Sequence, residues 1–235
     1  MHKDSVIVTK NGLDLKYFTE EPKKIGNRLI YSSSPDRGLL RLLELFPQIK
    51  AQVPDTELHI YYGFHNWKKM AQMLNNSKEL EQIALFENLL EQRSKEGGIT
   101  YHGRVSKAEL AKAFLASKVW SYPTGFTESS CITAMEAQAG GCVPVTTALA
   151  ALPETVSHGF VLKPPNTTPA YGEAFVRRVV KLLLDEKERA KYADAGREYT
   201  FQIHGWDKVA ASWEKHFHET LTAKIENPLP AFGNF

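Results

Sequence analysis

The chain has 235 residues, enough for one large domain or two small ones, and its 43% hydrophobic and 24% charged residues are ordinary for a soluble globular protein. A net charge of +2 is too small for nucleic acid or an anionic membrane to be the main partner. No apolar run approaches the roughly 20 residues of a membrane helix, and MHKDSVIVTK at 1–10 lacks the apolar stretch of a signal peptide. Cys131 and Cys142 stand among apolar or small residues, which favours reduced thiols over a disulfide. These features predict a soluble, cytoplasmic protein.

Segments with strand-like and helix-like periodicity alternate along the chain. β-Branched and aromatic residues bounded by turn residues mark the strands, and leucines or alanines at helical spacing mark the helices. In chain order, the sequence predicts a strand at 28–34, a helix at 37–52, a strand at 57–63, one or two helices within 67–93, a strand at 97–103, a helix at 106–117, a strand at 118–123, a helix beginning near Ser129, strands at 141–147 and 159–165, and helices at 168–184, 187–200 and 204–225.

Three local features bear on these boundaries. The sequence NNS at 75–77 interrupts a helical pattern. Ser106 and Glu109 have the spacing of a capping box, in which each side chain satisfies a backbone N–H of the other residue. Pro144 weakens the fifth predicted strand, because proline cannot donate to a strand ladder.

The order of these elements predicts the fold class. Strands that alternate with helices of roughly 10 to 15 residues indicate βαβ units. The sequence therefore predicts an α/β fold with one doubly wound, mainly parallel sheet of about six strands and helices on both faces. An Asn-Gly turn and little helical pattern at 6–18 indicate that residues 1–25 are an entry segment or interdomain linker. Residues 26–225 form the predicted domain, and residues 226–235 a predicted irregular tail.

The ends of three predicted strands carry residues that suit an anionic ligand. The loop SSSPDRG at 32–38, after the first strand, holds three hydroxyls and Arg37. Gly103 and Arg104 follow the third strand, and PTGFTESS at 123–130 follows the fourth. Ligands of open α/β sheets bind beyond the carboxyl ends of the strands, and the free N–H groups of helix N-termini bind anions. Helix capping alone explains any one of these loops, but their convergence at one edge predicts a phosphate-bearing ligand.

Two glutamates in the fourth loop and its helix stand eight positions apart. The same spacing separates Glu79 and Glu87 on a helix that reads as solvated, so context must distinguish the pairs. If the helix begins near Ser129, Glu128 and Glu136 lie roughly 12 Å apart along its axis, too far to share a proton or to form a hydrolytic carboxylate pair. They suit hydroxyls at the two ends of an elongated ligand that has a phosphate between them. The alternative for Glu136 is a surface position on a helix face of small residues.

Other ligand classes find less support in the sequence. Neither a Gly-x-Gly-x-x-Gly nor a Walker lysine motif occurs, which argues against dinucleotide and nucleoside-triphosphatase functions. The eight histidines lack metal-ligand spacing, and Cys131 is interpreted as a small packing residue. Tyr62, Phe64 and Trp67 form either an exposed aromatic patch that faces another domain or a part of the core.

Four stretches resemble one known family. TESSCITAMEAQAGGCVPV at 127–145 resembles the motif of two glutamates separated by seven residues in the family-4 retaining glycosyltransferases, which have the GT-B fold. VTKNGLDLKYF at 8–18 looks like the interdomain linker of that family, and YHGRVSKAELAKAFLAS at 101–117 resembles its segment entering the nucleotide pocket. HGWDKVAASWEKHF at 204–217 looks like the closing helix of that family.

The resemblance covers nearly the whole chain but only half of such an enzyme, which has an N-terminal acceptor domain and a C-terminal donor domain. It implies that the chain is the Rossmann-like donor-binding half of a retaining glycosyltransferase, which binds a nucleotide-diphosphate sugar and needs an acceptor domain supplied in cis or in trans. It implies no cofactor and no metal, and the chain contains no Asp-x-Asp. Little hexosyl transfer is expected from the chain alone, and any membrane association is expected to be peripheral, through the other half.

The resemblance also assigns roles to individual residues. Glu128 would contact the sugar hydroxyls and Glu136 the ribose, Arg37 would contact the diphosphate, and the backbone of Gly103 and Arg104 would line the base. The predicted catalytic residues are Glu128 and Arg37, no metal ligand is predicted, and the predicted donor-binding residues are Ser32, Ser33, Gly103, Arg104, Ser129, Ser130, Cys131, Ile132 and Glu136.

One departure from the family pattern leaves an alternative open. The family carries an arginine and a lysine five positions apart after its first strand, and here Ser32 stands at the arginine position and Arg37 at the lysine position. Arginine can still bind a phosphate through two N–H groups, but the second cation is missing. The alternative is therefore a non-catalytic module of GT-B type that binds a nucleotide sugar. The linker and the glutamate motif disfavour a third interpretation, a GT-B epimerase or phosphorylase.

Overall fold

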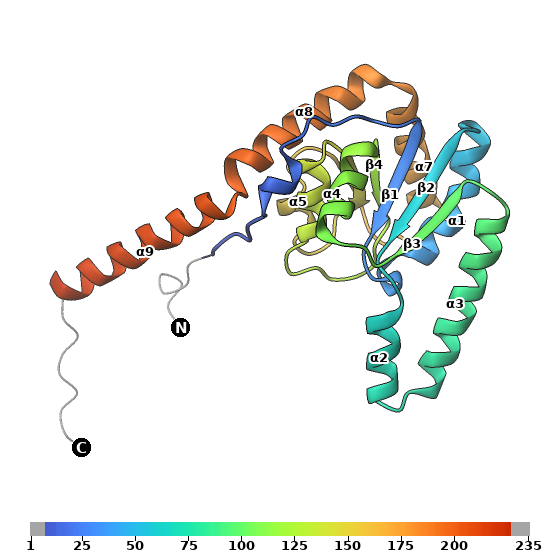
Figure 1. Ribbon diagram of the computed structural model, residues 1–235, viewed down its shortest axis with the longest axis horizontal. Helices are drawn as coiled ribbons and strands as arrows, with labels where there is room; N and C mark the ends of the chain where they lie inside the picture. The colour runs from blue at the N-terminus through green and yellow to red at the C-terminus, as the bar shows by residue number, and fades with distance from the viewer. Residues whose placement is uncertain (1–7, 227–235) are drawn as a thin grey trace.

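The computed structural model describes residues 8–226, and a parallel β-sheet lies at its centre (Figure 1). The sheet has six strands in the order β3-β2-β1-β4-β5-β6. Their bounds are β1 Asn27–Ser32, β2 Thr56–Tyr61, β3 Ile99–Gly103, β4 Val119–Tyr122, β5 Val143–Thr147 and β6 Phe160–Leu162. This confirms the predicted α/β class. Apart from Glu226, the predicted irregular tail lies outside the described residues.

Helices cover both faces of the sheet, as predicted. Helices α1 (Leu39–Gln52) and α7 (Pro169–Leu184) pack on one face, and α4 (Lys107–Ala116), α5 (Ile132–Ala139) and α8 (Glu186–Ile203) pack on the other. The remaining helical segments are η2 Leu15–Phe18, η3 Pro35–Arg37, α2 His65–Met73, α3 Ser77–Lys95, α6 Leu152–Thr155 and α9 Trp206–Glu226. The short α6 was not predicted, because its four residues are too few to show a helical period.

Capping residues set two boundaries where the sequence placed them. The helical stretch within 67–93 divides into α2 and α3 at Asn75, which has φ 50°, and the Asn76 side chain caps α3 by accepting the Glu79 N–H at 3.1 Å. The capping box of α4 is also confirmed. Its serine hydroxyl accepts the Glu109 N–H at 3.3 Å, and its glutamate carboxylate accepts the Ser106 N–H at 2.9 Å.

The start of α5 corrects a prediction. The helix begins at Ile132, not near Ser129, because a contact from a distant part of the chain holds the preceding loop. The side-chain amide of Asn11 donates to the Ser130 hydroxyl at 2.9 Å. Glu136 is therefore the fifth residue of α5. The axial separation expected for the two glutamates, which assumed continuous helix between them, does not apply.

Pro144 lies inside β5 without a cost to the sheet. The preceding residue, Val143, donates its N–H to the Lys118 carbonyl on the β4 side at 3.0 Å. Pairing between β5 and β6 begins only at Val145. The missing proline N–H therefore removes no ladder hydrogen bond, and the fifth strand forms as predicted.

The N-terminal part of the described chain packs on the domain. Leu13 and Phe18 are buried, and the Leu13 N–H donates to the His204 carbonyl at 2.6 Å. The Arg197 guanidinium donates to the Phe18 carbonyl at 2.8 Å. These contacts hold the segment beside α8, as Figure 1 shows. The division of the chain at residue 25 stays a prediction.

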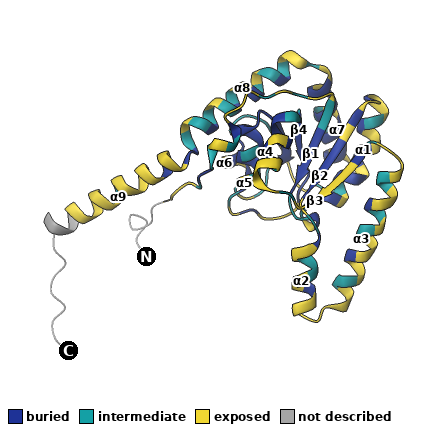
Figure 2. Ribbon diagram, viewed as in Figure 1, coloured by how far each residue is buried: buried dark blue, intermediate teal, exposed yellow. Residues whose placement is uncertain are grey.

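The core is centred on the two middle strands. Leu29 and Ile30 of β1 and Val119 and Trp120 of β4 are fully buried. Figure 2 shows these strands as buried, whereas α2, α3 and α9 extend from the sheet and expose much of their surface. The buried centre of the fold therefore lies directly below the strand ends where a ligand was predicted.

Candidate functional site

The strand order brings the predicted loops together. Because all the strands are parallel, the loops after β1, β3 and β4 leave the same edge of the sheet. The chain fills the sheet outward from β1 to β3 and then returns to β4, so β1 and β4 are neighbours whose following loops diverge. Such a switch point is where open α/β sheets bind ligands. The Ser33 hydroxyl and the Tyr122 hydroxyl lie 3.4 Å apart across it.

Glu128 is buried at this switch point and already has partners. The Tyr122 hydroxyl donates to its carboxylate at 2.7 Å, and one guanidinium nitrogen of Arg37 lies 3.4 Å from both of its oxygens. Burial, followed by the hydrogen bond to Glu128, raises the pKa of Tyr122 well above its usual value, so this hydroxyl stays a donor. Arg37 also lies over the Phe126 ring, 4.0 Å from its centre. The two predicted catalytic residues are thus brought together.

A cavity of about 310 Å³ opens beside this cluster. It is lined by side chains from the loop after β1, the end of β2, the start of α4 and the first turns of α5. Five of the predicted residues line it, namely Ser32, Ser33, Arg37, Arg104 and Glu136. The convergence predicted from the strand ends therefore produces a hollow of a size that suits part of a small-molecule ligand.

Glu136 differs from Glu128 because its carboxylate has no hydrogen-bond or ion-pair partner among the described residues, 8–226. Burial raises the pKa of Glu136 to about 7, and the charge of Lys107 opposes that shift. Within residues 8–226, no hydrogen bond to another side chain contributes to this pKa. A half-buried carboxylate that lines a cavity and has unused acceptor capacity is suited to accept hydrogen bonds from a ligand.

Lys107 is one of the residues that the sequence did not indicate. It is the first residue of α4 and lines the cavity together with Arg104, Arg37 and Glu136, and its charge acts on the Glu136 carboxylate. The N-terminus of a helix is an unfavourable place for a cation, but phosphate oxygens in the cavity would offset that cost. No motif marks Lys107, because only the fold brings the start of α4 next to α5.

The other predicted donor-binding residues do not line the cavity. Gly103, with φ 66°, directly precedes the lining residue Arg104. Burial raises the pKa of Cys131 to about 12, so this thiol is a packing residue. Ile132 is exposed, as is Ser129, and Ser130 is held by Asn11 as described above.

The aromatic patch that was considered after the second strand does not exist as one surface. Phe64 is buried, and Trp67 is packed against the core with its indole N–H donating to Glu79 at 2.8 Å. Tyr62 is separate from them and lines the cavity. Phe64 and Trp67 therefore belong to the core packing, and Tyr62 belongs to the candidate site.

Within residues 8–226, no group of three or more His, Cys, Asp or Glu side chains is arranged to hold a metal ion. His102 instead pairs with His59, with ring nitrogens 2.9 Å apart, and stacks on Tyr61. None of the helices in the same range combines the length and the apolar character needed to span a bilayer.

Comparison with protein families agrees with this geometry. Residues 27–199 match the family described as Glycosyl transferases group 1, and this match covers most of the chain. The chain belongs to this glycosyltransferase family. The matched range contains every strand of the sheet and both glutamates of the site. A search of curated proteins gives no match.

Solved structures show the same fold at low sequence identity. A glycosyltransferase from Rickettsia africae is 16% identical with a TM-score of 0.73, covering 94% of this chain and 59% of its own. Anabaena HepE, solved in complex with UDP, is 17% identical with a TM-score of 0.68, covering 94% and 58%. Sucrose-phosphate synthase from Thermosynechococcus elongatus is 19% identical with a TM-score of 0.67, covering 91% and 52%. The sheet therefore matches the Rossmann-like domains of GT-B proteins, and the chain spans between 52% and 59% of the length of these three.

Proposed function

We propose that this chain is the donor-binding half of a retaining, metal-independent glycosyltransferase that transfers a hexose from a nucleotide-diphosphate sugar. The observation that carries the proposal is the cavity at the switch point of the sheet. Arg37, Arg104 and Lys107 line it together with Glu136, and Arg37 also pairs with Glu128. A diphosphate flanked by hydroxyl-bearing groups has the charge and shape to satisfy these side chains.

The cations are assigned to the diphosphate. When the bond between the sugar and the phosphate breaks, negative charge grows on the departing nucleoside diphosphate. Positively charged groups that are already in place stabilise that charge in the transition state. Arg37 and Lys107 take this role from two sides of the cavity, and the hydroxyls of Ser32 and Ser33 add hydrogen bonds. This arrangement replaces the second cation that is missing from the loop after β1.

The two glutamates are assigned to hydroxyl groups of the donor. Glu136 has free acceptor capacity and receives the ribose hydroxyls. Glu128 uses part of its capacity on Tyr122 and Arg37, but a carboxylate has about four acceptor positions, so it can also receive a hydroxyl of the sugar. With both ends of the donor bound, the anomeric carbon is held at the open edge of the sheet, where an acceptor hydroxyl can replace the phosphate oxygen.

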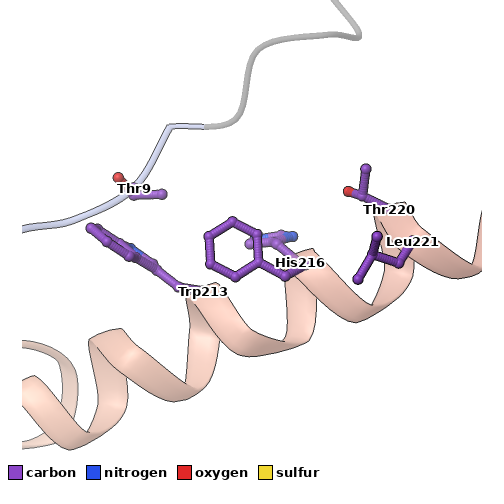
Figure 3. A pocket seen from close by; sticks show the side chains of 6 residues that line it. Thr9, Trp213, His216, Thr220 and Leu221 are labelled. Atoms are coloured by element: carbon purple, nitrogen blue, oxygen red, sulfur yellow. The ribbon is translucent and has the colours of Figure 1, made fainter.

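An acceptor domain, supplied in cis or in trans, is the proposed partner. Helix α9 extends away from the sheet, and Trp213, Phe217 and Leu221 form an exposed apolar stripe along it. With Thr9 they line a groove of about 530 Å³ between the N-terminal segment and α9, shown in Figure 3. The three similar structures are all longer than this chain, which supports a second domain, and we assign the exposed stripe to its contact.

A nucleotide-sugar-binding module without transfer activity is the second candidate, and Ser32 at the expected arginine position favours it. The two functions differ in the contacts that the protein must make with the diphosphate. A binding module needs only ground-state contacts, whereas a transferase needs cations placed on the leaving group. Transfer measured with the chain alone and after addition of a matching acceptor domain separates them. We expect donor binding with little turnover by the chain alone, and robust turnover without a second domain would contradict the donor-half proposal.

Thermal unfolding in the presence of UDP-, GDP-, ADP- and dTDP-sugars tests donor binding directly. A ligand at about 100 times its Kd stabilises the folded chain by roughly 2.7 kcal/mol. We expect one nucleotide class to raise the Tm of the wild type and not that of Glu136→Ala. Glu173→Ala, which changes an exposed glutamate of α7, is the matched control and should respond like the wild type. No shift with any of the sugars would overturn the proposed function.

A further inference from the structure

Tyr62 has a backbone conformation that tyrosine rarely adopts. Its φ is 86°, in the left-handed region, and its N–H donates to the Gly103 carbonyl at 2.8 Å. The residue follows β2 directly, where the register between β2 and β3 shifts. A bulky side chain at positive φ costs free energy that glycine would not. Such strain persists where the side chain makes a compensating contact, and it clusters at ligand sites.

The Tyr62 side chain lines the cavity, and another side chain fixes its hydroxyl. Its hydroxyl accepts a hydrogen bond from the Asn66 side chain at 3.1 Å. The residue remains 37% exposed, although it lines the cavity with Tyr61 and Arg104. Tyr61 is itself fixed by parallel stacking on His102, with ring centres 4.3 Å apart. One wall of the cavity therefore presents an aromatic side chain that is held at its hydroxyl and open to solvent.

We propose that Tyr62 stacks on the nucleobase of the donor. This inference rests on the proposed function, which puts the base beside the backbone of Gly103 and Arg104. The hydrogen bond between Tyr62 and Gly103 places the aromatic residue next to that backbone. Stacking uses the flat face that every base has. It would also supply the compensating contact for the strained backbone of Tyr62. The hydrogen-bonding edge of the base is left to the backbone of the loop after β3.

Three variants separate stacking from a structural role. Tyr62→Gly removes the ring and the strain, Tyr62→Phe keeps the ring, and Asn75→Gly relieves a positive φ of 50° in the turn between α2 and α3, away from the cavity. Isothermal titration gives the affinity for the nucleoside diphosphate that the wild type binds, and competition gives the affinity for inorganic pyrophosphate, which has no base. Thermal unfolding without ligand reports the stability of each variant.

We expect Tyr62→Gly to bind the nucleoside diphosphate about tenfold more weakly than the wild type, to bind pyrophosphate equally well and to unfold at the same or a higher temperature. Tyr62→Phe and Asn75→Gly should retain the wild-type affinity. Equal nucleotide affinity in Tyr62→Gly, or an equal loss for pyrophosphate, would overturn the inference. The proposed function fails differently, because then the wild type itself binds none of the nucleotides.

Discussion

The loop at 123–131 and helix α5 each hold one glutamate of the site and surround it in opposite ways. In the loop, Glu128 is buried and joined to Tyr122 and Arg37. On the helix, Glu136 lies at the cavity wall with a pKa raised to about 7 by burial. One carboxylate is therefore built into the fold, and the other has no hydrogen-bond partner in the part of the chain that the structure describes.

This difference separates stability from ligand binding within a single motif. Removing a carboxylate that has partners leaves those partners unsatisfied, so the change should appear mainly as lost stability. Removing a carboxylate without partners relieves a desolvation cost, so the change should appear as gained stability and lost affinity. The two members of the pair, which look equivalent in the sequence, should thus respond to substitution with opposite signs.

The largest expected effect is on Glu128. Glu128→Ala leaves the buried Tyr122 hydroxyl without its acceptor and Arg37 without its counter-charge, so we expect a loss of about 2 to 4 kcal/mol in the free energy of unfolding. Urea denaturation at pH 7.5 measures it. Tyr122→Phe, which removes only the donor, is the control and should lose about 1 kcal/mol. A Glu128→Ala variant as stable as the wild type would mean that the pair is not part of the folded framework.

The next effect is the opposite response of Glu136. The unfolded chain holds this group near pKa 4.5 and the folded chain near 7, so the folded state binds more protons between these values. Stability therefore falls as the pH rises from about 4.5 through 7. Glu136→Gln, which does not titrate, should be more stable than the wild type by roughly 1 to 3 kcal/mol at pH 8 and equally stable below pH 4.5. Unfolding curves at both pH values test this, and an equal difference at the two would contradict it.

The affinity for the donor should depend on pH through the same ionisation of Glu136. Only the ionised Glu136 accepts hydrogen bonds at both oxygens, so the affinity for a nucleotide sugar should rise with pH up to about 7 and then level off. Between pH 6 and pH 8 we expect about a tenfold gain. Nucleotide sugars are the right probes, because both of their phosphates are esterified and do not titrate in this range. A pH profile that Glu136→Gln leaves unchanged would assign the titration to another group.

The fold could be predicted from the sequence because its elements are marked locally. Alternating apolar segments, the Ser106–Glu109 capping box and the Asn-rich break between α2 and α3 are all visible within a few residues. The start of α5 was misplaced because its determinant, Asn11, lies 119 positions before Ser130. The site divides in the same way. Loops and motifs pointed to both glutamates, to Arg37 and Arg104, and to the hydroxyls of Ser32 and Ser33.

The other side chains of the site were missed because no local pattern indicates them. In the sequence, Tyr122 has the pattern of an ordinary strand residue. Only the structure shows that its hydroxyl donates to Glu128. Lys107 reads as a solvated helix position inside a capping box. Only the packing of α4 beside α5 places this ammonium group at the cavity wall together with Glu136. Charges that converge from separate elements are thus the part of a binding site that a single sequence shows least.

Lys107 therefore gives the smallest and most specific prediction. Lys107→Ala should weaken binding of the nucleotide sugar by about five- to tenfold, the value of one charge-assisted hydrogen bond in a partly solvated site. Its Tm should change little, because relief of the cation at the positive end of a helix is offset by the loss of its attraction to ionised Glu136. Lys112→Ala, an exposed lysine of the same helix, is the matched control and should leave donor affinity unchanged. Equal affinities in both variants would show that Lys107 does not bind the diphosphate, and would favour the binding module over the transferase.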